Sequence, residues 1–430
     1  MRGGARMAPM TTLTDLEAQI PDAVARLQGV AARTPVQLDQ RLSEATGSEV
    51  WLKREDLQPV RSYKLRGAYN LMAQLTRDER LAGVVCASAG NHGQGVAYSA
   101  ATLGITATVV VPHTTPRQKR QRILDIGRGR VELVLHGTTY DEASEEASRL
   151  ATQGKVLVPA FNDARTAAGQ ATLIVEAFEQ LGFAPDVVVL PVGGGGLVSG
   201  AAAWLRAHHP DVRIIGVEPE GAPCVAAAIS AGRPVTLNEI DTFVDGAAVR
   251  RVGDFTFDAI REAGIELIRV PEGQICTEML DMYQTDGIIA EPAGALAAAA
   301  LPTGGVGQRA QIPTGSRVLV VVSGGNNDVS RYAEIVERSL IHEGRKRYFL
   351  VDFPQQPGAL RTFLDNVLGP DDDITYFEYV KRNARETGPA LVGVELGNPT
   401  DYPFLLQRIE ECGMQAHEVA YDSPFFQFLT

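Results

Sequence analysis

Lys64 is the residue of this chain whose type and setting best suit covalent chemistry. It lies within the stretch 61–68, at the predicted start of a helix that Ser62 is expected to cap. The helix dipole disfavours a charged ammonium at that end, and a neutral lysine can form a Schiff base with an aldehyde. The residues that give this helix an apolar face are Leu65, Ala68, Met72 and Leu75. Most lysines at helix starts are solvated surface charges, so this prediction depends on the rest of the chain.

Three further stretches place small and polar residues where a predicted strand ends. Residues 88–95 read SAGNHGQG, and backbone N–H groups at such a strand-to-helix junction suit a carboxylate. Residues 191–197 contain four consecutive glycines, which allow the backbone to approach and bind a phosphate. Residues 323–327 read SGGNN, and the serine hydroxyl suits a ring nitrogen of a ligand. Each stretch alone is more often a turn or a helix cap, whereas the set in this order is specific.

A dinucleotide site is the alternative interpretation of the glycine run. The stretch has no GxGxxG pattern, because Val198 and Ser199 follow the glycines, and no Walker-type lysine follows it. Glu218 nevertheless ends the next predicted strand, where an acid that binds a ribose would lie. This alternative therefore stays open at the level of motifs.

Alternating strands and helices must position the four stretches. We predict strands at 49–53, 83–88, 107–112, 131–135, 156–159, 186–192, 213–218, 265–270 and 318–322. We predict the main helices at 20–27, 92–103, 116–126, 140–152, 166–181 and 197–208. This alternation is typical of α/β proteins with parallel sheets and right-handed crossovers. Because about 300 residues exceed one small sheet, we expect two lobes with a cleft between them.

The pattern changes after Gly344. Predicted strands at 347–352, 374–381, 389–396 and 417–421 alternate with predicted helices at 358–367 and 402–412. This β-α-β-β-α-β order is typical of a ferredoxin-like α+β domain. We therefore predict a catalytic domain over 1–344, with a smaller lobe over about 55–158 and a larger lobe formed by the remainder, followed by a second domain over 345–430. The segment 329–342 is interpreted as the helix that connects the two.

Composition excludes several classes of protein. The chain has 430 residues, of which 45% are hydrophobic and 21% charged, and its net charge of −12 argues against a nucleic-acid partner. We find no apolar run long enough for a membrane span and no signal-peptide pattern. The four cysteines are scattered without a CxxC motif, which favours reduced thiols and a cytoplasmic location. The seven histidines show no metal-ligand spacing.

Together the four stretches resemble the fold-type-II pyridoxal-phosphate enzymes, and within them threonine dehydratase (threonine ammonia-lyase). The resemblance covers about residues 30–340 and includes the motifs KRED at 53–56, GQ at 169–170, GVE at 216–218 and EPAGA at 291–295. The C-terminal region resembles one copy of the ACT-like regulatory domain of the biosynthetic form. The resemblance implies a two-lobed fold like that of tryptophan synthase β. It also implies a lyase that converts L-threonine, and to some extent L-serine, by β-elimination; threonine yields 2-oxobutanoate and ammonia.

The resemblance also implies roles for single residues. Lys64 would hold pyridoxal 5′-phosphate and, once freed by the substrate, remove its Cα proton. Asn91 would bond the ring hydroxyl, and Ser323 would meet the pyridine nitrogen. The backbone amides that cradle the phosphate would be those of Gly193, Gly194, Gly195, Gly196 and Leu197. The residues that bind the substrate carboxylate would be Ser88, Gly90, Asn91 and His92.

Related activities share most of these motifs. A serine/threonine racemase has a proton-carrying serine at the position of Ala89, and alanine cannot carry a proton. The racemase's cation site pairs an acid matching Glu218 with an acid six positions on, which is Cys224 here, so we predict no metal site. A degradative dehydratase typically lacks the C-terminal domain. A non-catalytic amino-acid sensor is a further alternative, although it would need neither Lys64 nor Ser323.

The resemblance of the C-terminal region implies regulation. It implies a homotetramer that catalyses the first committed step of isoleucine biosynthesis and is inhibited by isoleucine, with valine as a second candidate effector. The turn at 355–360 joins a predicted strand to a helix, whose first N–H groups could bind the carboxylate of such an effector. Neither a nucleic acid nor a membrane is expected as a partner.

Overall fold

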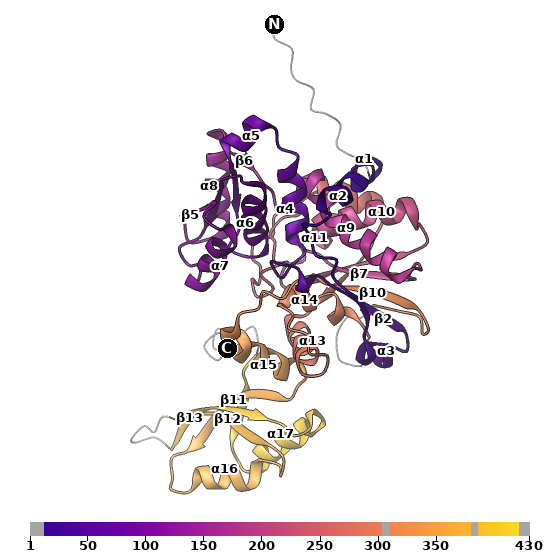
Figure 1. The fold of residues 1–430 in the computed structure, drawn as a ribbon. Coiled ribbons are helices and arrows are strands. Elements are labelled where there is room, and N and C mark those ends of the chain that lie inside the picture. Colours follow the sequence, from indigo (N-terminus) through magenta and orange to yellow (C-terminus); the bar gives the residue numbers. More distant parts are fainter. Residues whose placement is uncertain (1–12, 303–309, 380–385, 421–430) are drawn as a thin grey trace. The chain divides into compact units, whose positions relative to one another are not determined.

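The computed structural model describes residues 13–302, 310–379 and 386–420 (Figure 1). The chain divides into two compact units. The first comprises Met1–Glu272 and Asp281–Asn327, and the second comprises Gly273–Leu280 and Asp328–Thr430. Helix α13 (Glu272–Gln284) therefore contributes residues to both.

A six-stranded sheet forms the larger part of the first unit, which we call the large lobe. Its strand order is β1-β2-β10-β7-β8-β9. The strands are β1 (Val36–Leu38), β2 (Glu49–Arg54), β7 (Val187–Pro191), β8 (Arg213–Pro219), β9 (Glu266–Val270) and β10 (Arg317–Val322). Every neighbouring pair is parallel except β1 and β2. The central strands are nearly all apolar because helices cover both faces of such sheets.

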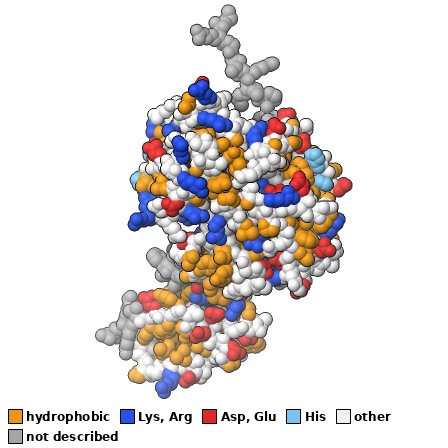
Figure 2. All heavy atoms as spheres, viewed as in Figure 1, with side chains coloured by type: hydrophobic (Ala, Val, Ile, Leu, Met, Phe, Trp, Pro, Cys, Tyr) orange, Lys and Arg blue, Asp and Glu red, His pale blue; other side chains and the backbone are white. Residues whose placement is uncertain are grey.

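A separate four-stranded parallel sheet forms the small lobe of the same unit. Its order is β5-β4-β3-β6, with β3 (Val84–Ala87), β4 (Ala107–Val111), β5 (Val131–Leu135) and β6 (Val156–Leu157). The helices of this lobe are α6 (Asn91–Leu103), α7 (Arg117–Gly127) and α8 (Tyr140–Thr152). The prediction of two lobes built on parallel sheets is thus confirmed. Lys and Arg side chains gather over this part of the first unit in the face that Figure 2 shows, so the negative net charge is unevenly distributed.

The remaining helices of the first unit surround the large sheet and join the lobes. They are α1 (Leu13–Glu17), α2 (Ile20–Leu27), α3 (Gln40–Thr46), α4 (Lys64–Ala73), α5 (Arg77–Ala82), α9 (Ala164–Leu181), α10 (Gly196–His208), α11 (Cys224–Ala231), α12 (Asp254–Ala263) and α14 (Pro292–Ala295), with a 3₁₀ turn at Glu55–Leu57. None of the helices in the described part of the chain combines the length and apolarity that crossing a bilayer requires.

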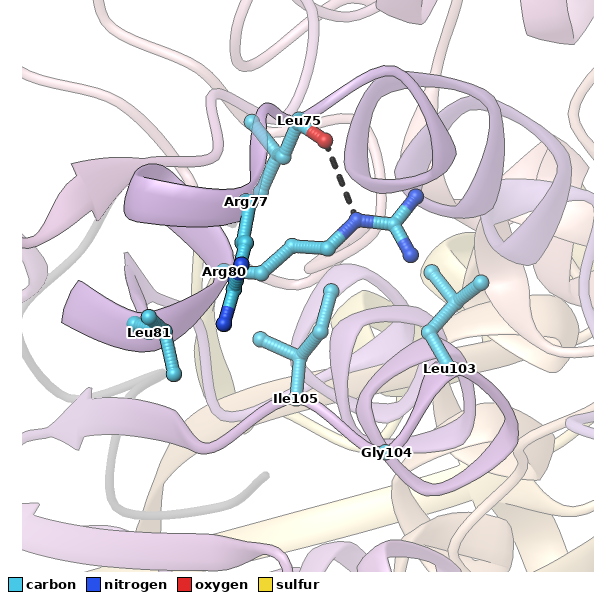
Figure 3. A pocket seen from close by; sticks show the side chains of 7 residues that line it. All are labelled: Leu75, Arg77, Arg80, Leu81, Leu103, Gly104 and Ile105. Atoms are coloured by element: carbon cyan, nitrogen blue, oxygen red, sulfur yellow. Dashed lines mark hydrogen bonds between the residues drawn. The ribbon is translucent and has the colours of Figure 1, made fainter.

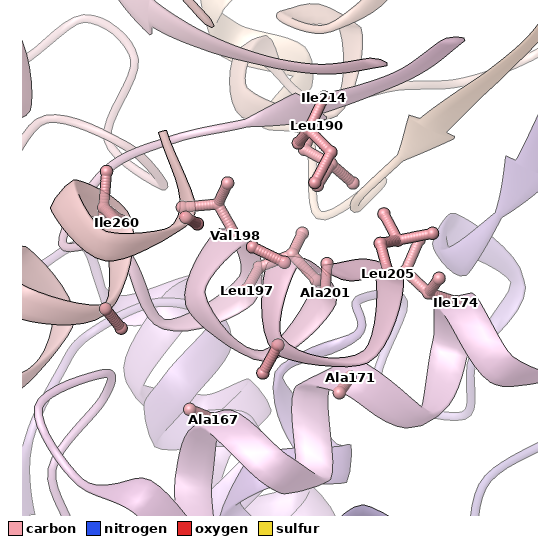
Figure 4. Close-up of a cluster of buried hydrophobic side chains, with 14 of the residues drawn as sticks. Ala167, Ala171, Ile174, Leu190, Leu197, Val198, Ala201, Leu205, Ile214 and Ile260 are labelled. Atoms are coloured by element: carbon pink, nitrogen blue, oxygen red, sulfur yellow. The ribbon is translucent and has the colours of Figure 1, made fainter. Parts of the chain in front are cut away.

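The main core lies where α9 and α10 pack beside β7 and β8 (Figure 4). Its central side chains are Ile174, Leu190, Leu197, Val198, Leu205, Ile214 and Ile260. A Cβ atom at Gly200 would collide with the carbonyl oxygen of Ala167, so only glycine permits this approach of α10 to α9. The core therefore fixes α10, whose first turn follows the glycine run.

A buried ionic network supports the helix that Lys64 begins. Arg66 donates from Nε and one Nη to the two oxygens of Glu55, both at 2.8 Å, and also lies 3.2 Å from Glu176. Lys53 lies 2.5 Å from Glu176. Removing one member of such a network would leave an uncompensated buried charge, at a cost of roughly 3–5 kcal/mol. The network therefore fixes the first turn of α4 relative to β2 and α9.

The second unit contains an antiparallel sheet in the order β12-β13-β11-β14. Its elements are β11 (Lys346–Pro354), α16 (Ala359–Val367), β12 (Asp373–Tyr379), β13 (Thr387–Glu395), α17 (Tyr402–Glu411) and β14 (Gln415–Glu418). The predicted ferredoxin-like order is confirmed; the predicted strand ends at 380–381 and 421 lie outside the described residues. The expected connector is α15 (Tyr332–His342), preceded by a 3₁₀ turn. It packs on the α13 segment of this unit, where the Ser339 and Thr277 hydroxyls are 2.9 Å apart.

Candidate active site

Lys64 begins α4 beside the SGGNN loop that follows β10. The backbone N–H of Tyr63 donates to the Ser323 carbonyl at 3.2 Å, and that of Gly325 donates to the Arg61 carbonyl at 2.9 Å. Ser62 and Gly324 form an antiparallel bridge between these two bonds. Two of the four predicted stretches therefore lie side by side, although they are far apart in the sequence.

The prediction that Ser62 caps α4 is wrong. The N-cap is Tyr63, which makes no capping bond with its side chain. The bridge to Gly324 holds Ser62 in a fully buried position, where its hydroxyl has no hydrogen-bond partner among the described residues. A buried polar group without a partner is unfavourable unless a ligand or water satisfies it. This hydroxyl therefore marks a polar position two residues from Lys64.

Asn91, the first residue of α6, links the SAGNHGQG stretch to the SGGNN loop. Its Oδ1 accepts a hydrogen bond from Asn326 Nδ2 at 2.7 Å. Its Nδ2 donates to Glu291 Oε1 at 2.5 Å. The structure thus brings three of the four stretches together and adds Glu291, the first residue of the EPAGA motif.

Glu291 is a candidate functional residue to which the sequence assigned no role. Burial raises the pKa of its carboxyl to about 7, and the charge of Asp245 adds to this effect. The hydrogen bond from Asn91 and the charges of Lys119 and Lys64 act in the opposite direction. A buried carboxyl that titrates near neutral pH beside a lysine is typical of functional sites. The sequence signal was the EPAGA motif itself, but the burial of its acid is a tertiary property.

The start of α6 has the close backbone approach expected of an anion site. The Gly90 N–H donates to Ser88 Oγ at 3.2 Å, and a Cβ atom at Gly93 would collide with the Ser88 carbonyl oxygen. His92 is buried, and its Nε2 lies 2.8 Å from the Val158 carbonyl, so this nitrogen carries the hydrogen. Burial lowers the His92 pKa to about 4, so the ring is neutral near pH 7. His92 can therefore offer an anion its backbone N–H rather than a positive charge.

The glycine run forms a cradle before α10. Gly195 has a φ of 92° and is the N-cap, and the Ser199 N–H bonds to its carbonyl at 2.9 Å. The N–H groups of residues 196–198 precede this first helical bond and have no acceptor within the helix. A Cβ atom at Gly194 would collide with the ring of Phe161, and one at Gly193 would lie 2.8 Å from the Ala247 carbonyl oxygen. The packing against Phe161 and Ala247 therefore leaves room only for glycine at these two positions.

Two side chains turn carbonyl groups of the glycine run toward the protein. The Thr256 hydroxyl, buried on α12, donates to the Gly194 carbonyl at 2.7 Å. The Cys224 thiol, at the start of α11, lies 3.5 Å from the Gly193 carbonyl. Because the carbonyls of Gly193 and Gly194 point toward these side chains, the N–H groups on the opposite side of the same peptide bonds can face a bound anion. Nothing near Thr256 in the chain resembles a phosphate site, so the sequence carries no signal for this contact.

Ser323, the remaining predicted residue, is buried at the end of β10. Its hydroxyl donates to the Ala293 carbonyl at 2.9 Å. Together these contacts bring Lys64, Asn91, Glu291 and Ser323 to one site. The charge of Lys64 also contributes, as a lesser cause, to the lowered pKa of His92.

Glu218, the acid that kept the dinucleotide interpretation open, has another role. It is fully buried, and its two carboxylate oxygens accept the N–H groups of Val225 at 2.7 Å and Ala226 at 2.9 Å. Burial raises its pKa to about 7. Both carboxylate oxygens thus accept hydrogen bonds from the first turn of α11. Glu218 is therefore not available to bind a ribose, and the dinucleotide interpretation loses its acid.

A hollow of about 500 Å³ lies at the surface of the first unit, away from these stretches (Figure 3). It is lined by Leu75, Arg77, Arg80, Leu81, Leu103, Gly104 and Ile105. Arg80 donates to the Leu75 carbonyl at 3.0 Å and to the Ala73 carbonyl at 2.7 Å. Its guanidinium is therefore already bonded to the backbone, and the hollow shares no residue with the predicted site.

The two-lobed fold and this site define a fold-type-II pyridoxal-phosphate enzyme. The family model for pyridoxal-phosphate dependent enzymes matches residues 27–324, and the model for the C-terminal regulatory domain of threonine dehydratase matches residues 337–429. The chain is 53% identical to the biosynthetic L-threonine dehydratase of Mycobacterium tuberculosis, over 96% of this chain and 95% of that one. It is 46% identical to that of Bacillus subtilis, over 94% of each. The chain therefore belongs to the biosynthetic threonine dehydratase family.

Solved structures agree with this assignment. The processed form of threonine deaminase isoform 2 from Solanum lycopersicum superimposes with a TM-score of 0.70 and 35% identity, covering 77% of this chain and 96% of that one. Maize serine racemase superimposes with a TM-score of 0.68 and 30% identity, covering 76% and 98%. Because both share the fold, the fold does not separate the two activities. The uncapped N–H groups of the glycine run and the lysine that begins α4 fit pyridoxal phosphate, the cofactor of this family.

Proposed function

We propose that this chain converts L-threonine to 2-oxobutanoate and ammonia and acts to some extent on L-serine. The observation that carries this proposal is the convergence of Lys64, Asn91 and Ser323 on one site in an enzyme of the biosynthetic threonine dehydratase family. The names of the relatives supply the reaction, and the contacts of the site support the same chemistry here.

The residues that would hold the cofactor follow from the site. Lys64 would bind the aldehyde, and the N–H groups of Gly193–Leu197 would bind the phosphate. Asn91 would bond the ring oxygen, and Ser323 would face the ring nitrogen. Bound pyridoxal phosphate supplies an aldehyde for the substrate amine and a ring that accepts the electrons released at Cα.

The protein's own groups would then bind the substrate and move its protons. Ser88, Gly90, Asn91 and His92 surround the first turn of α6, where N–H groups would hold the threonine carboxylate. This anchor would direct Cα toward Lys64, whose amine acts as the general base for the Cα proton. Loss of the β-hydroxyl as water leaves an enamine, whose hydrolysis consumes one water and yields 2-oxobutanoate and ammonia.

The C-terminal unit is proposed to regulate this reaction. We propose a catalytic domain over 1–344 with a smaller lobe over about 55–158, and an ACT-like domain over 345–430 that binds isoleucine, or alternatively valine. Gly358 has a φ of 91° and precedes α16, which has no side-chain cap, so N–H groups at this helix start can donate hydrogen bonds to a carboxylate. The proposal includes a cytoplasmic homotetramer that acts in isoleucine biosynthesis.

The test is an assay of 2-oxobutanoate formation from L-threonine with the purified full-length chain, with and without isoleucine. The proposal expects turnover that isoleucine inhibits, in a protein with the visible absorbance of lysine-bound cofactor. Serine racemisation should be assayed in parallel, because maize serine racemase shares the fold. D-serine formation without threonine turnover would overturn the proposed reaction.

A further inference from the structure

The orientation of the Asn326 amide is determined by a backbone carbonyl. Its Nδ2 donates to the Val60 carbonyl at 2.8 Å and to Asn91 Oδ1 at 2.7 Å. A carbonyl oxygen can only accept, so the side of Asn326 that faces Val60 must be its NH₂ group. The two hydrogens of that group serve the two acceptors.

The amide of Asn91 is fixed in turn. Because Asn326 presents its NH₂ group, the atom of Asn91 that faces it must be Oδ1. The NH₂ group of Asn91 is therefore on the other side, where it donates to Glu291 Oε1 at 2.5 Å. The remaining hydrogen of this NH₂ group has no partner among the residues that the structure describes. The NH₂ group of Asn91 thus has a spare donor.

Glu291, which accepts the hydrogen bond from Asn91, is itself held by the SGGNN loop. Glu291 is buried, and a Cβ atom at Gly324 would collide with its Oε1. The Glu291 N–H donates to the Gly324 carbonyl at 3.1 Å. The SGGNN loop therefore holds both partners of Asn91, one through Asn326 and the other through Gly324.

We propose that Asn326 is a positioning residue that makes the Asn91 amide a hydrogen-bond donor, and not an acceptor, toward the ring oxygen of bound pyridoxal phosphate. This inference rests on the proposed role of Asn91. A donor stabilises the ionised form of a phenolic oxygen. A reversed amide would present Oδ1 instead and would favour the protonated form. Asn326 would not contact the cofactor. It would set the protonation state of the cofactor's ring oxygen through Asn91.

The experiment measures the visible absorbance of the bound cofactor in the full-length holoenzyme as a function of pH, which does not require turnover. In Asn326→Ala and Asn326→Asp, the absorbance change that reports protonation of the ring oxygen should move to higher pH by about one to two units, because the ionised oxygen loses a hydrogen bond from Asn91. The aspartate keeps the shape of the side chain but lacks its donors, so a shift shared by both variants cannot be due to a cavity. Asn91→Ala should produce a shift in the same direction.

Asn327→Asp is the matched control. Asn327 lies in the same loop and also donates to a backbone carbonyl, that of Ala290, at 3.1 Å. Its substitution should leave the transition where it is in the unaltered protein. If Asn91→Ala shifts the transition while both Asn326 variants behave like the unaltered protein, the positioning role is overturned and the role of Asn91 stands. If Asn91→Ala produces no shift, the proposed role of Asn91 fails, and the inference fails with it.

Discussion

Asn91 Nδ2 donates to Glu291 Oε1 at 2.5 Å and thereby joins the first turn of α6 in the small lobe to the residue before α14 in the large lobe. A second contact joins the lobes nearby: Nζ of Lys119 on α7 lies 2.8 Å from Oδ2 of Asp245. The charge of Asp245 also raises the pKa of Glu291. The protonation of Glu291 is therefore linked to contacts between the lobes at the candidate active site.

Glu291→Gln should change how stability depends on pH. Burial raises the Glu291 pKa from 4.5 to about 7, so the folded protein holds this proton more tightly than the unfolded chain. The resulting stabilisation is complete below about pH 4.5 and is lost as the pH rises to about 7, by up to roughly 3 kcal/mol. Glutamine cannot ionise, so the variant should lose less stability than the unaltered protein between pH 5 and pH 8. Urea unfolding of the cofactor-free proteins at pH 5 and pH 8 measures the change in the free energy of unfolding. The same change in the variant and in the unaltered protein would contradict the raised pKa of Glu291.

Lys64→Ala should abolish both dehydratase activity and the visible absorbance of lysine-bound cofactor. The reason is that Lys64 provides the only amine proposed to bind the aldehyde. Borohydride reduction followed by peptide mapping locates the attachment. A variant that still carries a reducible, covalently bound chromophore would show that another lysine is the anchor.

Thr256→Val should weaken binding of pyridoxal phosphate by roughly fivefold. The substitution keeps the volume of the side chain but removes the hydroxyl that bonds the Gly194 carbonyl, and such a bond contributes about 1 kcal/mol. Fluorescence titration of the cofactor-free protein gives the dissociation constant. Thr256→Ser, which keeps the hydroxyl, is the control and should bind more tightly than the valine variant. Equal affinities for the two variants would show that this hydroxyl does not shape the cradle.

Ala89→Ser should introduce some racemase activity. The resemblance to serine/threonine racemases implies a serine at this position, and a hydroxyl there would provide a second proton donor at the substrate. Chiral analysis of serine after incubation with the variant detects the D-isomer, with the unaltered protein as the control. Absence of any D-isomer, in a variant that still dehydrates threonine, would count against this account of the two activities.

Removal of residues 345–430 should leave lysine-dependent dehydratase activity but abolish inhibition by isoleucine. The cut after Gly344 keeps α15 on the α13 segment, through the contact between Ser339 and Thr277. If isoleucine inhibits the full-length enzyme by this route, threonine must weaken isoleucine binding by the same factor. Oligomer mass should be measured alongside activity, because the removed region could also hold subunits together. A folded truncated enzyme that isoleucine still inhibits would refute the regulatory role.

Much of the architecture could be predicted because its signals are local. The parallel strands are continuous apolar runs, and Gly104 ends α6 in the left-handed conformation that glycine favours. The same holds for β11 to β14, whose alternation with two helices predicted the ferredoxin-like sheet. Short elements such as β1 were missed, since three residues carry no periodic signal.

The order of the motifs along the chain was sufficient to predict the family. Only the tertiary structure decided what those residues contact. The bridge to Gly324 removed Ser62 from the capping position, and Thr256 reached the glycine run from a helix 62 residues further along the chain. Burial and charge from other elements raised the pKa of Glu291 and oriented the amide of Asn91. These properties depend on distances between segments that the sequence does not place together, because desolvation and hydrogen-bond direction exist only once the chain has folded.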